Sequence, residues 1–429
     1  MRIFCLLAVL AVSAPFVTQA ETYTLTLKQA IEQGLTRNPD VTLAKLDQMR
    51  AAQGVPLAQD PFYPHVGAGS GLAYNNGMPL SIEGSAPSVI QARASEDIFN
   101  RPQHYAIERQ RETAKSATFG TAQKRDDVAW QIAGLYLDAD RANRMIETAR
   151  NQIDSFQKVL DTVQARVDEG RELPIDARQA QVNIARARVR VSNLESDRDI
   201  AERNLAIALG YTANDLVAPS AADRTQPVVS VDEAEAVQNA LAASFDIKRL
   251  QSLLIAKGLE IKGTEARRLP QIDLVAQYAL FANYNNIQQY FAKFQHNNGE
   301  IGASIQIPVF SGTGIKTAIA QFETDEEHLR VEMQSAKDRI TMSVHQSYVT
   351  INRAKLAADL AREDLDLSRD RLTLALDQLN DGRATLRDLE QARIDESEKW
   401  IAFYDAQFNQ ERARLDLLHQ TGSLVAAIQ

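Results

Sequence analysis

Two long stretches of the chain repeat apolar residues at helical spacing and contain no proline. They are Gln103–Glu169 and Gly314–Asp381, each close to 67 residues long. Because a proline inside a helix costs about 3 kcal/mol or more, such stretches predict long helices. At about 1.5 Å of rise per residue, each helix would extend roughly 100 Å and would need a partner helix along most of its length.

A shorter helical stretch follows each long one, after a charged turn that contains glycine. The two turns read EGRELPID and DGRATLRD. Apolar residues recur every seven positions in these regions, as in Leu365, Leu372 and Leu379. This spacing is typical of paired helices. The pattern therefore predicts two helical hairpins, over residues 103–210 and 314–422.

Four other stretches alternate apolar and polar residues with the period of a β-strand. In the last of them, Ile301 and Ile305 fall on one face and Ser304 falls on the other. Such alternation is typical of strands that are buried on one side only. The four stretches predict two β-hairpins, at residues 65–99 and 271–310. Their length of about ten residues matches a tilted membrane strand.

Four strands are too few to close a barrel, and an open sheet edge is not tolerated in the hydrocarbon of a membrane. If the hairpins enter a membrane, several chains must pool their strands. Otherwise the apolar faces need a soluble core, for which only 6% aromatic residues are available. The loop FANYNNIQQYFAKF carries five aromatic residues, which fit either an interfacial belt or an ordinary surface loop.

The two halves of the chain share residues at the boundaries of their predicted elements. Matched prolines and glycines are harder to attribute to chance than matched alanines and leucines, so we interpret the chain as internally duplicated. The predicted units are residues 21–220 and 221–429. At offsets of 206 and then 212 positions, the matched pairs are Asp40 and Asp246, Pro64 and Pro270, Gly170 and Gly382, Asp176 and Asp388, and Gly210 and Gly422.

The first twenty residues predict a cleaved secretory signal peptide. Arg2 precedes an apolar run at Ile3–Val12, and Thr18-Gln19-Ala20 offers a small-residue cleavage site. An uncleaved anchor is the weaker interpretation, because the run is far shorter than the ~20 residues that span a bilayer. The only cysteine, Cys5, lies inside the run rather than at the cleavage site. We therefore expect no lipidation, no disulfide and no thiolate metal site in the mature chain.

Charge and motif content argue against nucleic-acid binding and against catalysis. The net charge is −9, with 47 Lys+Arg against 56 Asp+Glu, and no block of basic residues is present. The six histidines are scattered, without metal-ligand spacing. The sequence contains neither a Gly-rich phosphate loop nor a nucleophile elbow. We therefore expect no enzyme activity, no cofactor and no metal.

Several ordered motifs resemble those of TolC-like outer-membrane efflux proteins. They are the opening LTLKQAIEQGLTRNPDV, the strand starts at Tyr63-Pro64 and Leu269-Pro270, the strand end IQIPVFSG, and the turns GRELPIDARQAQ and GRATLRDLEQA. Each motif alone is weak, but the ordered set is specific. The similarity covers essentially all of Glu21–Gln429.

The resemblance implies a mainly α fold in which a long antiparallel coiled-coil α-barrel carries a transmembrane β-barrel. Each chain would supply four strands, and a homotrimer would close a 12-stranded barrel in the outer membrane of a Gram-negative bacterium. Such proteins are passive exit ducts for drugs, small molecules or polypeptides in tripartite efflux pumps or type I secretion systems. Their partners are a periplasmic adaptor and an inner-membrane transporter. The alternative is a soluble periplasmic coiled-coil protein with an adaptor or structural function.

The resemblance also implies a periplasmic gate at the ends of the helical hairpins. Asp176 and Asp388 match positions where family members place inward-facing aspartates, and Glu390 lies close to the second of them. A ring of carboxylates repeated by threefold symmetry would form a negative constriction that binds cations. The alternative is that these residues are solvated acids on helix faces.

Two further groups of residues are predicted from the resemblance. Glycines in the hairpin turns would let an adaptor approach closely, although simple helix C-capping explains them equally well. The Pro-x-Phe-x-Gly pattern would mark the junction between the last strand and the following helix. The adaptor-docking residues are Gly170, Arg171, Gly382 and Arg383, and the junction residues are Pro308, Phe310 and Gly312.

Overall fold

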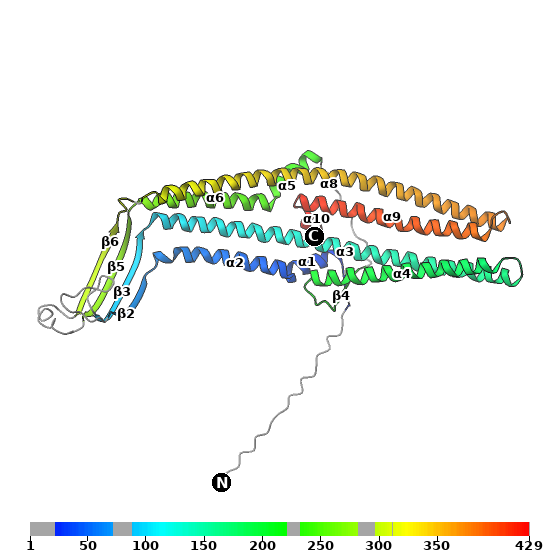
Figure 1. Ribbon diagram of the computed structural model, residues 1–429, viewed down its shortest axis with the longest axis horizontal. Helices are drawn as coiled ribbons and strands as arrows, with labels where there is room; N and C mark the ends of the chain where they lie inside the picture. The colour runs from blue at the N-terminus through cyan, green and yellow to red at the C-terminus, as the bar shows by residue number, and fades with distance from the viewer. Residues whose placement is uncertain (1–21, 72–87, 221–231, 282–296, 311, 429) are drawn as a thin grey trace, which may run out of the picture.

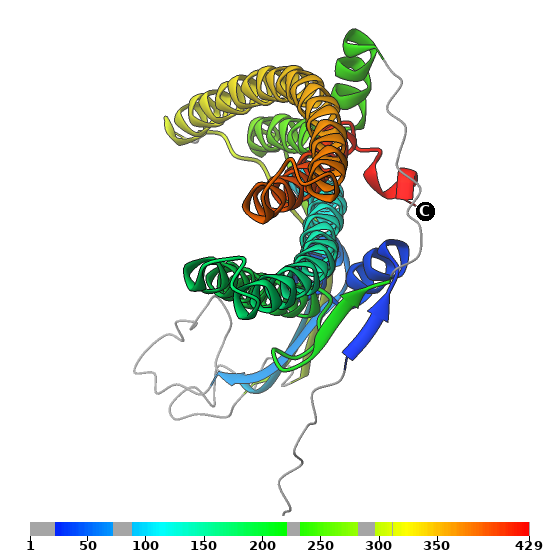
Figure 2. The ribbon, with the colours of Figure 1, turned by 90° about the vertical axis from the view of Figure 1, so that its right-hand side faces the viewer.

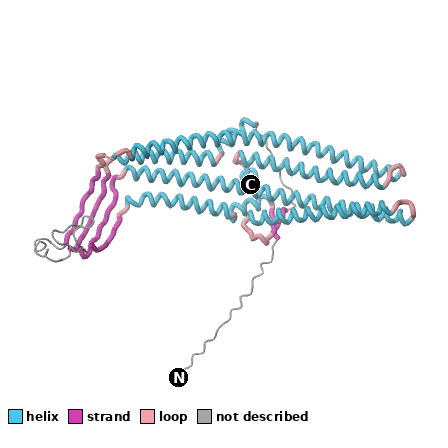
Figure 3. Tube along the Cα trace, viewed as in Figure 1, coloured by secondary structure: helices cyan, strands magenta, loops and turns pink. Residues whose placement is uncertain are grey.

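The computed structural model describes residues 22–71, 88–220, 232–281, 297–310 and 312–428. Within these ranges the molecule is mainly helical and strongly elongated (Figure 1). A four-stranded sheet lies at one end, and two long helices run from it to the opposite end. Figure 3 shows that turns close this far end, where each long helix meets a shorter one. The predicted signal peptide and the aromatic loop at 282–294 lie outside the described residues.

Both halves of the chain contain the same series of elements, and their second helices have 21 residues each and their last long helices 35 each. The first half contains α1 (Leu27–Arg37), α2 (Pro39–Gln59), β2 (His65–Gly71), β3 (Ser88–Phe99), α3 (Arg101–Asp168) and α4 (Pro174–Ala208). The second half contains α5 (Glu233–Ala243), α6 (Phe245–Glu265), β5 (Gln271–Phe281), β6 (Asn297–Gln306), α8 (Gly314–Asn380) and α9 (Leu386–Gln420). Smaller elements are β1 (Thr22–Leu25), β4 (Leu216–Pro219), the 3₁₀ turns η1 (Asp60–Phe62) and η2 (Ala266–Arg268), and α10 (Leu424–Ile428).

Helix α3 begins at Arg101, two residues before the predicted start at Gln103, so that prediction is wrong by half a turn. Pro102 lies in the first turn of the helix, where its missing N–H would have had no helical partner in any case. The side chain of Asn100 accepts a hydrogen bond from the Gln103 amide at 3.1 Å and so caps the helix. A proline near a helix start therefore marked the first turn rather than a boundary.

The sheet is antiparallel throughout, with the order β2-β3-β5-β6. Its register aligns Arg93 with Gln277 and Gln277 with Glu300, and the Gln277 amide donates to the Glu300 carboxylate at 2.9 Å. Paired residues share a face, so the next row, which includes Ala94 and Ile301, lies on the opposite face. The alternation predicted from the sequence is therefore confirmed as one polar and one apolar face.

The second β-hairpin ends before residue 310, the end that the sequence predicts for it. β6 runs from Asn297 to Gln306, because Gln306 pairs with Gln271, which is the first residue of β5. Beyond that pair no partner strand remains, and Pro308 has no N–H to contribute to a ladder. The residues Ile307–Phe310 therefore form a connection between strand and helix.

The helices form one continuous curved wall. Helix α3 packs against α2, α4, α6 and α9, and α8 packs against α6 and α9. Nearer the sheet the order across the wall is therefore α2, α3, α6, α8, and farther from it α4, α3, α9, α8. Viewed end-on, these helices trace an arc (Figure 2). We call β2, α2 and α4 the first edge of the molecule, and β6 and α8 the second edge.

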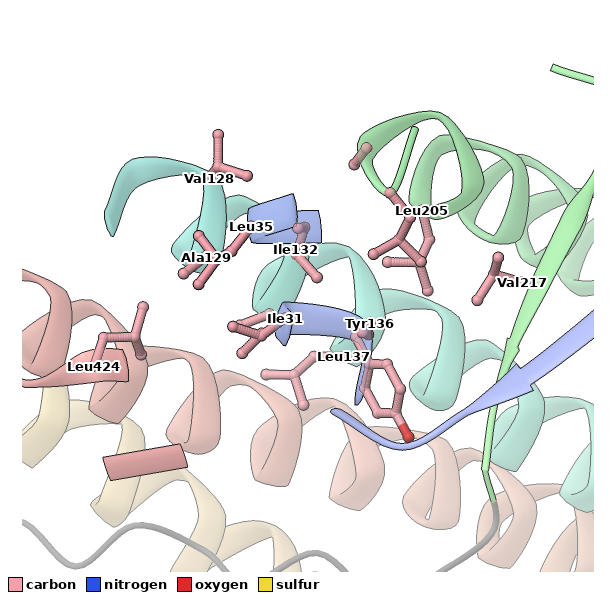
Figure 4. Close-up of a cluster of buried hydrophobic side chains, with 14 of the residues drawn as sticks. Ile31, Leu35, Val128, Ala129, Ile132, Tyr136, Leu137, Leu205, Val217 and Leu424 are labelled. Atoms are coloured by element: carbon pink, nitrogen blue, oxygen red, sulfur yellow. The ribbon is translucent and has the colours of Figure 1, made fainter. Parts of the chain in front are cut away.

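The largest apolar cluster lies in the middle of the molecule, and we call it the central core (Figure 4). Ile132, Tyr136 and Leu137 of α3 are at most 1% exposed and meet Ile31 of α1 and Leu205 of α4. The Tyr136 hydroxyl donates to the Leu25 carbonyl at 3.2 Å, so its burial leaves no unpaired donor. Helices α9 and α10 add residues to the same cluster, which therefore fastens both halves of the chain together.

Candidate functional site: hairpin tips, seam and edges

Both hairpin turns at the far end are built on glycines with a left-handed backbone. Gly170 has a φ of +73° and Gly382 a φ of +72°. The amide of the residue after each glycine donates back to the helix: Arg171 to the Arg166 carbonyl and Arg383 to that of Gln378, both at 2.8 Å. This is the Schellman arrangement, which favours glycine for local reasons.

The surroundings of these turns are open. No described atom lies within 4 Å of the position that a Cβ would occupy at Gly170 or Gly382. The side chains of Arg171 and Arg383 are 70% and 78% exposed, and in the described part of the chain each pairs with an acid of its own turn, at 3.2 Å and 3.9 Å. The tips therefore present exposed guanidinium groups beside glycines that leave space.

The three predicted gate carboxylates have different surroundings. Asp388 belongs to a capping box at the start of α9, where its carboxylate accepts from the Thr385 amide at 2.9 Å and from the Thr385 hydroxyl at 2.7 Å. The hydroxyl hydrogen bond holds the pKa of Asp388 below its ordinary value. An aspartate at this position therefore has a local explanation, because it completes the capping box of α9.

Asp176 connects the two helical hairpins. It lies in the first turn of α4, and its carboxylate accepts a hydrogen bond at 3.0 Å from the guanidinium of Arg387, on α9. The arginine side chain is 76% exposed and the aspartate 24%. The contact is therefore a solvent-exposed ion pair that spans the two hairpins at the tip.

Glu390 is buried between the hairpins, at 8% exposure. The amide of Asn183 on α4 is 3.5 Å from its carboxylate, and Asn183 is itself 6% exposed. Burial raises the pKa of Glu390, and the nearby Asp176 charge raises it further. A cavity of about 210 Å³ brings Asp176 and Glu390 together and is also lined by Arg387. Asp388 does not line it.

Sequence reasoning missed Arg387 and Asn183. Arg387 carries a detectable signal: it is a cation in the first turn of a helix, where the helix dipole disfavours positive charge. Such a residue is explained by a nearby anion, which here is Asp176. Asn183 carries no comparable signal, because an asparagine in the middle of a helix is ordinarily exposed.

The two hairpins also share apolar contacts at the tip. Val159 and Val163 of α3, Ala177 of α4 and Leu386 of α9 form one buried cluster, which we call the tip cluster. It is far smaller than the central core. Within one chain, a few apolar side chains and the polar contacts of Asp176 and Glu390 therefore hold the two hairpins together at the tip.

Along the seam between α3 and α9, polar pairs join the two halves. The Trp130 indole donates to Asp416 at 2.7 Å, and the His419 ring contacts Asp127 at 3.1 Å and Asp126 at 3.8 Å. Burial raises the pKa of Asp126 to about 6, with Asp127 raising it and His419 lowering it. Farther toward the tip, Arg141 pairs with Asp405 at 2.6 Å, and Arg393 donates to the Ser155 carbonyl at 3.1 Å.

At the junction of strand and helix, Phe310 is 91% exposed and Gly312 has a φ of +61°. A left-handed residue at this point lets the chain turn from the sheet into α8. Pro308 precedes both, beyond the end of the ladder.

Apolar residues repeat every seven positions on both edges of the wall and remain exposed. On α4 they are Ile175, Val182 and Val189, at 66%, 40% and 60% exposure. On α8 they are Leu360, Leu367 and Leu374, at 64%, 49% and 55% exposure. Among the described strands, β2 and β6 each have only one neighbour in the sheet.

Within the described residue ranges, no group of three or more His, Cys, Asp or Glu side chains is placed to hold a metal ion. No helix in the same ranges combines the length and the apolar character needed to cross a membrane.

The structure is thus a curved helical wall joined end-on to a small amphipathic sheet whose outer strands are β2 and β6. The chain belongs to the outer membrane efflux protein family, whose family model matches residues 30–211 and 236–423. The members of this family are channels, not enzymes.

One related protein and two solved structures are consistent with membership of this family. The outer membrane efflux protein BepC of Brucella suis is 20% identical over 297 residues, which are 69% of this chain and 63% of BepC, so the match spans under two thirds of BepC. The structure of CusC superposes with a TM-score of 0.78 at 15% identity and covers 95% of both chains. VceC of Vibrio cholerae gives 0.74 at 15% identity over 92% of this chain and 96% of VceC. At these identities the two structures establish the fold alone.

Proposed function

We propose that three copies of this chain form an outer-membrane channel that serves as the exit duct of a tripartite efflux pump or a type I secretion system. The observation that carries the proposal is that the sheet and the helical wall both end in two edges. Among the described residues, β2 and β6 each have one neighbour in the sheet, and α8 is covered on its outer side only in the middle, where α5 packs against Val344.

Closure follows from placing the first edge of one copy against the second edge of the next. Such a head-to-tail contact repeats until the ring closes. In the sheet, β2 would pair with β6 of the neighbouring copy, so that three copies supply twelve strands. A closed barrel satisfies the backbone groups that an open sheet would leave unpaired in a membrane.

The exposed heptad positions fit the same arrangement in the helical wall. The stripe on α4 and the stripe on α8 both repeat at seven residues, which is the spacing that lets helices interdigitate. Exposed apolar stripes of this kind are costly unless another helix covers them. The occupant that this geometry supports is a second copy of the chain.

The polar face of the sheet would line the lumen, and the apolar face would contact outer-membrane lipid. The row of Arg93, Gln277 and Glu300 lies on the polar face, whereas Ile301 and Ile305 lie on the apolar face. The duct would be passive, and energy would come from an inner-membrane transporter coupled through a periplasmic adaptor. BepC, itself an outer membrane efflux protein, supports this assignment.

We further propose that the hairpin tips contain the periplasmic gate. The Asp176–Arg387 pair and the buried Glu390 connect the two hairpins at the tip, where the hairpins share few apolar contacts. Repeated by threefold symmetry, Asp176 and Asp388 would place carboxylates around a narrow opening. Gly170 and Gly382, with Arg171 and Arg383, would then form the surface on which the adaptor docks.

We also propose that the halves 21–220 and 221–429 are copies of one ancestral unit. Helices α2 and α6 have equal lengths, as do α4 and α9. The left-handed glycines that follow the four long helices α3, α4, α8 and α9 are matched as well. Gly170 corresponds to Gly382, and Gly210 corresponds to Gly422.

The test is the oligomeric state of purified protein after the stripe on α8 is disrupted. The double substitution Leu367→Glu and Leu374→Glu places charges on the stripe, and we expect it to convert trimers into monomers in light scattering. Thr373→Glu, on another face of the same helix, is the matched control and should leave the trimer intact. Wild-type protein that is monomeric, or recovered in the soluble periplasm, would contradict the channel and favour the soluble alternative.

A further inference from the structure

The seam between α3 and α9 contains a cavity of about 450 Å³. It lies between the Arg141–Asp405 pair and the Arg393–Ser155 hydrogen bond. These two contacts are 14 residues apart on α3, which corresponds to about 21 Å of helix. A volume of this size is typical of small-molecule sites.

Five of the thirteen residues that line the cavity are apolar or aromatic, and the other eight are polar or charged. Phe156 of α3 is buried, and Leu372 and Leu376 of α8 lie beneath the seam. Trp400 and Tyr404 of α9 stack on each other with ring centroids 5.5 Å apart. Such a lining favours the apolar body of a ligand over water alone.

Acidic groups give the cavity its charge. Glu147 and Glu396 line it, and within the described residues Glu147 makes no ion pair and no hydrogen bond. The only basic residue in the lining is Arg393, whose guanidinium is held by the Ser155 carbonyl. The cavity therefore has more negative than positive charge, and one carboxylate is uncommitted.

Two further contacts indicate what kind of ligand fits. The Arg369 guanidinium lies 5.2 Å from the centroid of the Trp400 ring and already makes the cation–π contact there, so a ligand's ammonium group would be held by the carboxylates instead. Ser397 lines the cavity at 5% exposure, and its hydroxyl has no hydrogen-bond partner among the described residues. A buried hydroxyl without a partner is unfavourable and would be satisfied by a ligand N–H donor.

We propose that this seam cavity is a binding site for amphiphilic organic ammonium ions. The apolar body would lie against Phe156 and Trp400, and the ammonium group would meet Glu147 and Glu396. Because the ligand would contact both α3 and α9, its binding would stabilise the arrangement of the two helices seen here. The site belongs to one chain and does not depend on the proposed channel function.

Energy transfer from tryptophan to a dansyl group tests the proposal directly, because the chain has only two tryptophans. In Trp130→Phe protein, Trp400 is the sole donor. Dansylcadaverine, which carries a primary ammonium, should give saturable sensitised emission. The control probe, dansyl-aminohexanoate, has the same aromatic body and a carboxylate instead, and it should give no saturable signal.

Substitutions then assign the signal to the cavity. Glu147→Gln together with Glu396→Gln keeps the shapes and removes the charges, and it should weaken dansylcadaverine binding at least about tenfold. Trp400→Phe, with Trp130 retained, should sharply lower the saturable signal, because Trp130 is at least 17 residues, or about 26 Å of helix, from the lining residues of α3. This variant serves if Trp130→Phe does not assemble. Equal signals from both probes, or dansylcadaverine affinity unchanged by the double substitution, would overturn the proposal. A signal that rises linearly would show partition into detergent and would overturn it as well.

Discussion

The middle of the molecule and the hairpin tips are held together by different means. In the middle, the central core collects fully buried side chains from α1, α3, α4, α9 and α10. At the tips, the tip cluster has four buried members, and the exposed Asp176–Arg387 pair and the buried contact between Asn183 and Glu390 add polar contacts. More apolar side chains are therefore buried in the middle, and fewer contacts hold the hairpins together at the tips.

The glycines illustrate the same difference. Gly210 and Gly170 both have a left-handed backbone, with φ of +81° and +73°. A Cβ at Gly210 would lie 2.7 Å from the Arg37 carbonyl oxygen, whereas a Cβ at Gly170 would meet nothing within 4 Å. The chain thus has no room for a methyl group at Gly210, in the middle, but has room for one at Gly170, at the tip. The tip can accept a neighbouring surface that the middle could not.

The largest effect should come from truncating the central core. Leu137→Ala removes a side chain that is 1% exposed, and we expect it to lower the free energy of unfolding by about 2–5 kcal/mol. The matched control at the tip is Leu173→Ala, where the side chain is 65% exposed and the loss should stay within about 0.5 kcal/mol. Chemical unfolding followed by circular dichroism measures both. Equal losses would contradict the contrast between the two regions.

The sequence was sufficient for most of the fold but not for the tip. Long proline-free stretches and strict alternation located the helices and the sheet, because those periods are set by backbone geometry. The boundaries failed at Pro102 and Pro308, where the outcome depended on first-turn geometry and on where the partner strand begins. The contacts of Asp176 and Glu390 could not be foreseen, since they depend on residues of the other hairpin, more than 200 positions away.

An intermediate effect, dependent on pH, is expected at the seam beside the central core. Burial raises the pKa of Asp126 to about 6 from an ordinary value of 3.8, while His419 and Asp127 face it. Between these two pH values the folded chain keeps a proton that the unfolded chain has released. This group therefore stabilises the fold as the pH falls through about 6, and above that pH the full cost of a buried charge is present.

Asp126→Asn removes that charge. We expect it to stabilise the fold by on the order of 1–2 kcal/mol at pH 7.5 and by clearly less near pH 4.5, where the wild-type carboxyl is protonated. Thermal unfolding midpoints at the two pH values provide the measurement. Asp127→Asn is the control, since it removes the closer partner of His419, at 3.1 Å, and should not stabilise at either pH. A gain for Asp126→Asn that is independent of pH would show that the charge of Asp126 is not the cause.

The smallest effect on stability, and the most informative for the gate, is expected at the tip. The Asp176–Arg387 pair is largely exposed on the arginine side, so breaking it should cost at most about 1 kcal/mol of folding free energy. The same contact spans the two hairpins, so its loss should favour an open tip. We expect Asp176→Ala and Arg387→Ala each to raise the open probability of single channels in planar bilayers.

The double variant decides whether the two residues act together. If the pair acts as one contact, Asp176→Ala with Arg387→Ala should open the channel no more than either change alone, because the second substitution removes nothing further. Glu169→Ala with Arg171→Ala provides the control, since that pair lies within one turn and joins no hairpins. Additive effects would mean that the residues act separately. Undiminished block of the Asp176→Ala channel by divalent cations would remove Asp176 from the gate, because a lumen-facing carboxylate must contribute to cation binding there.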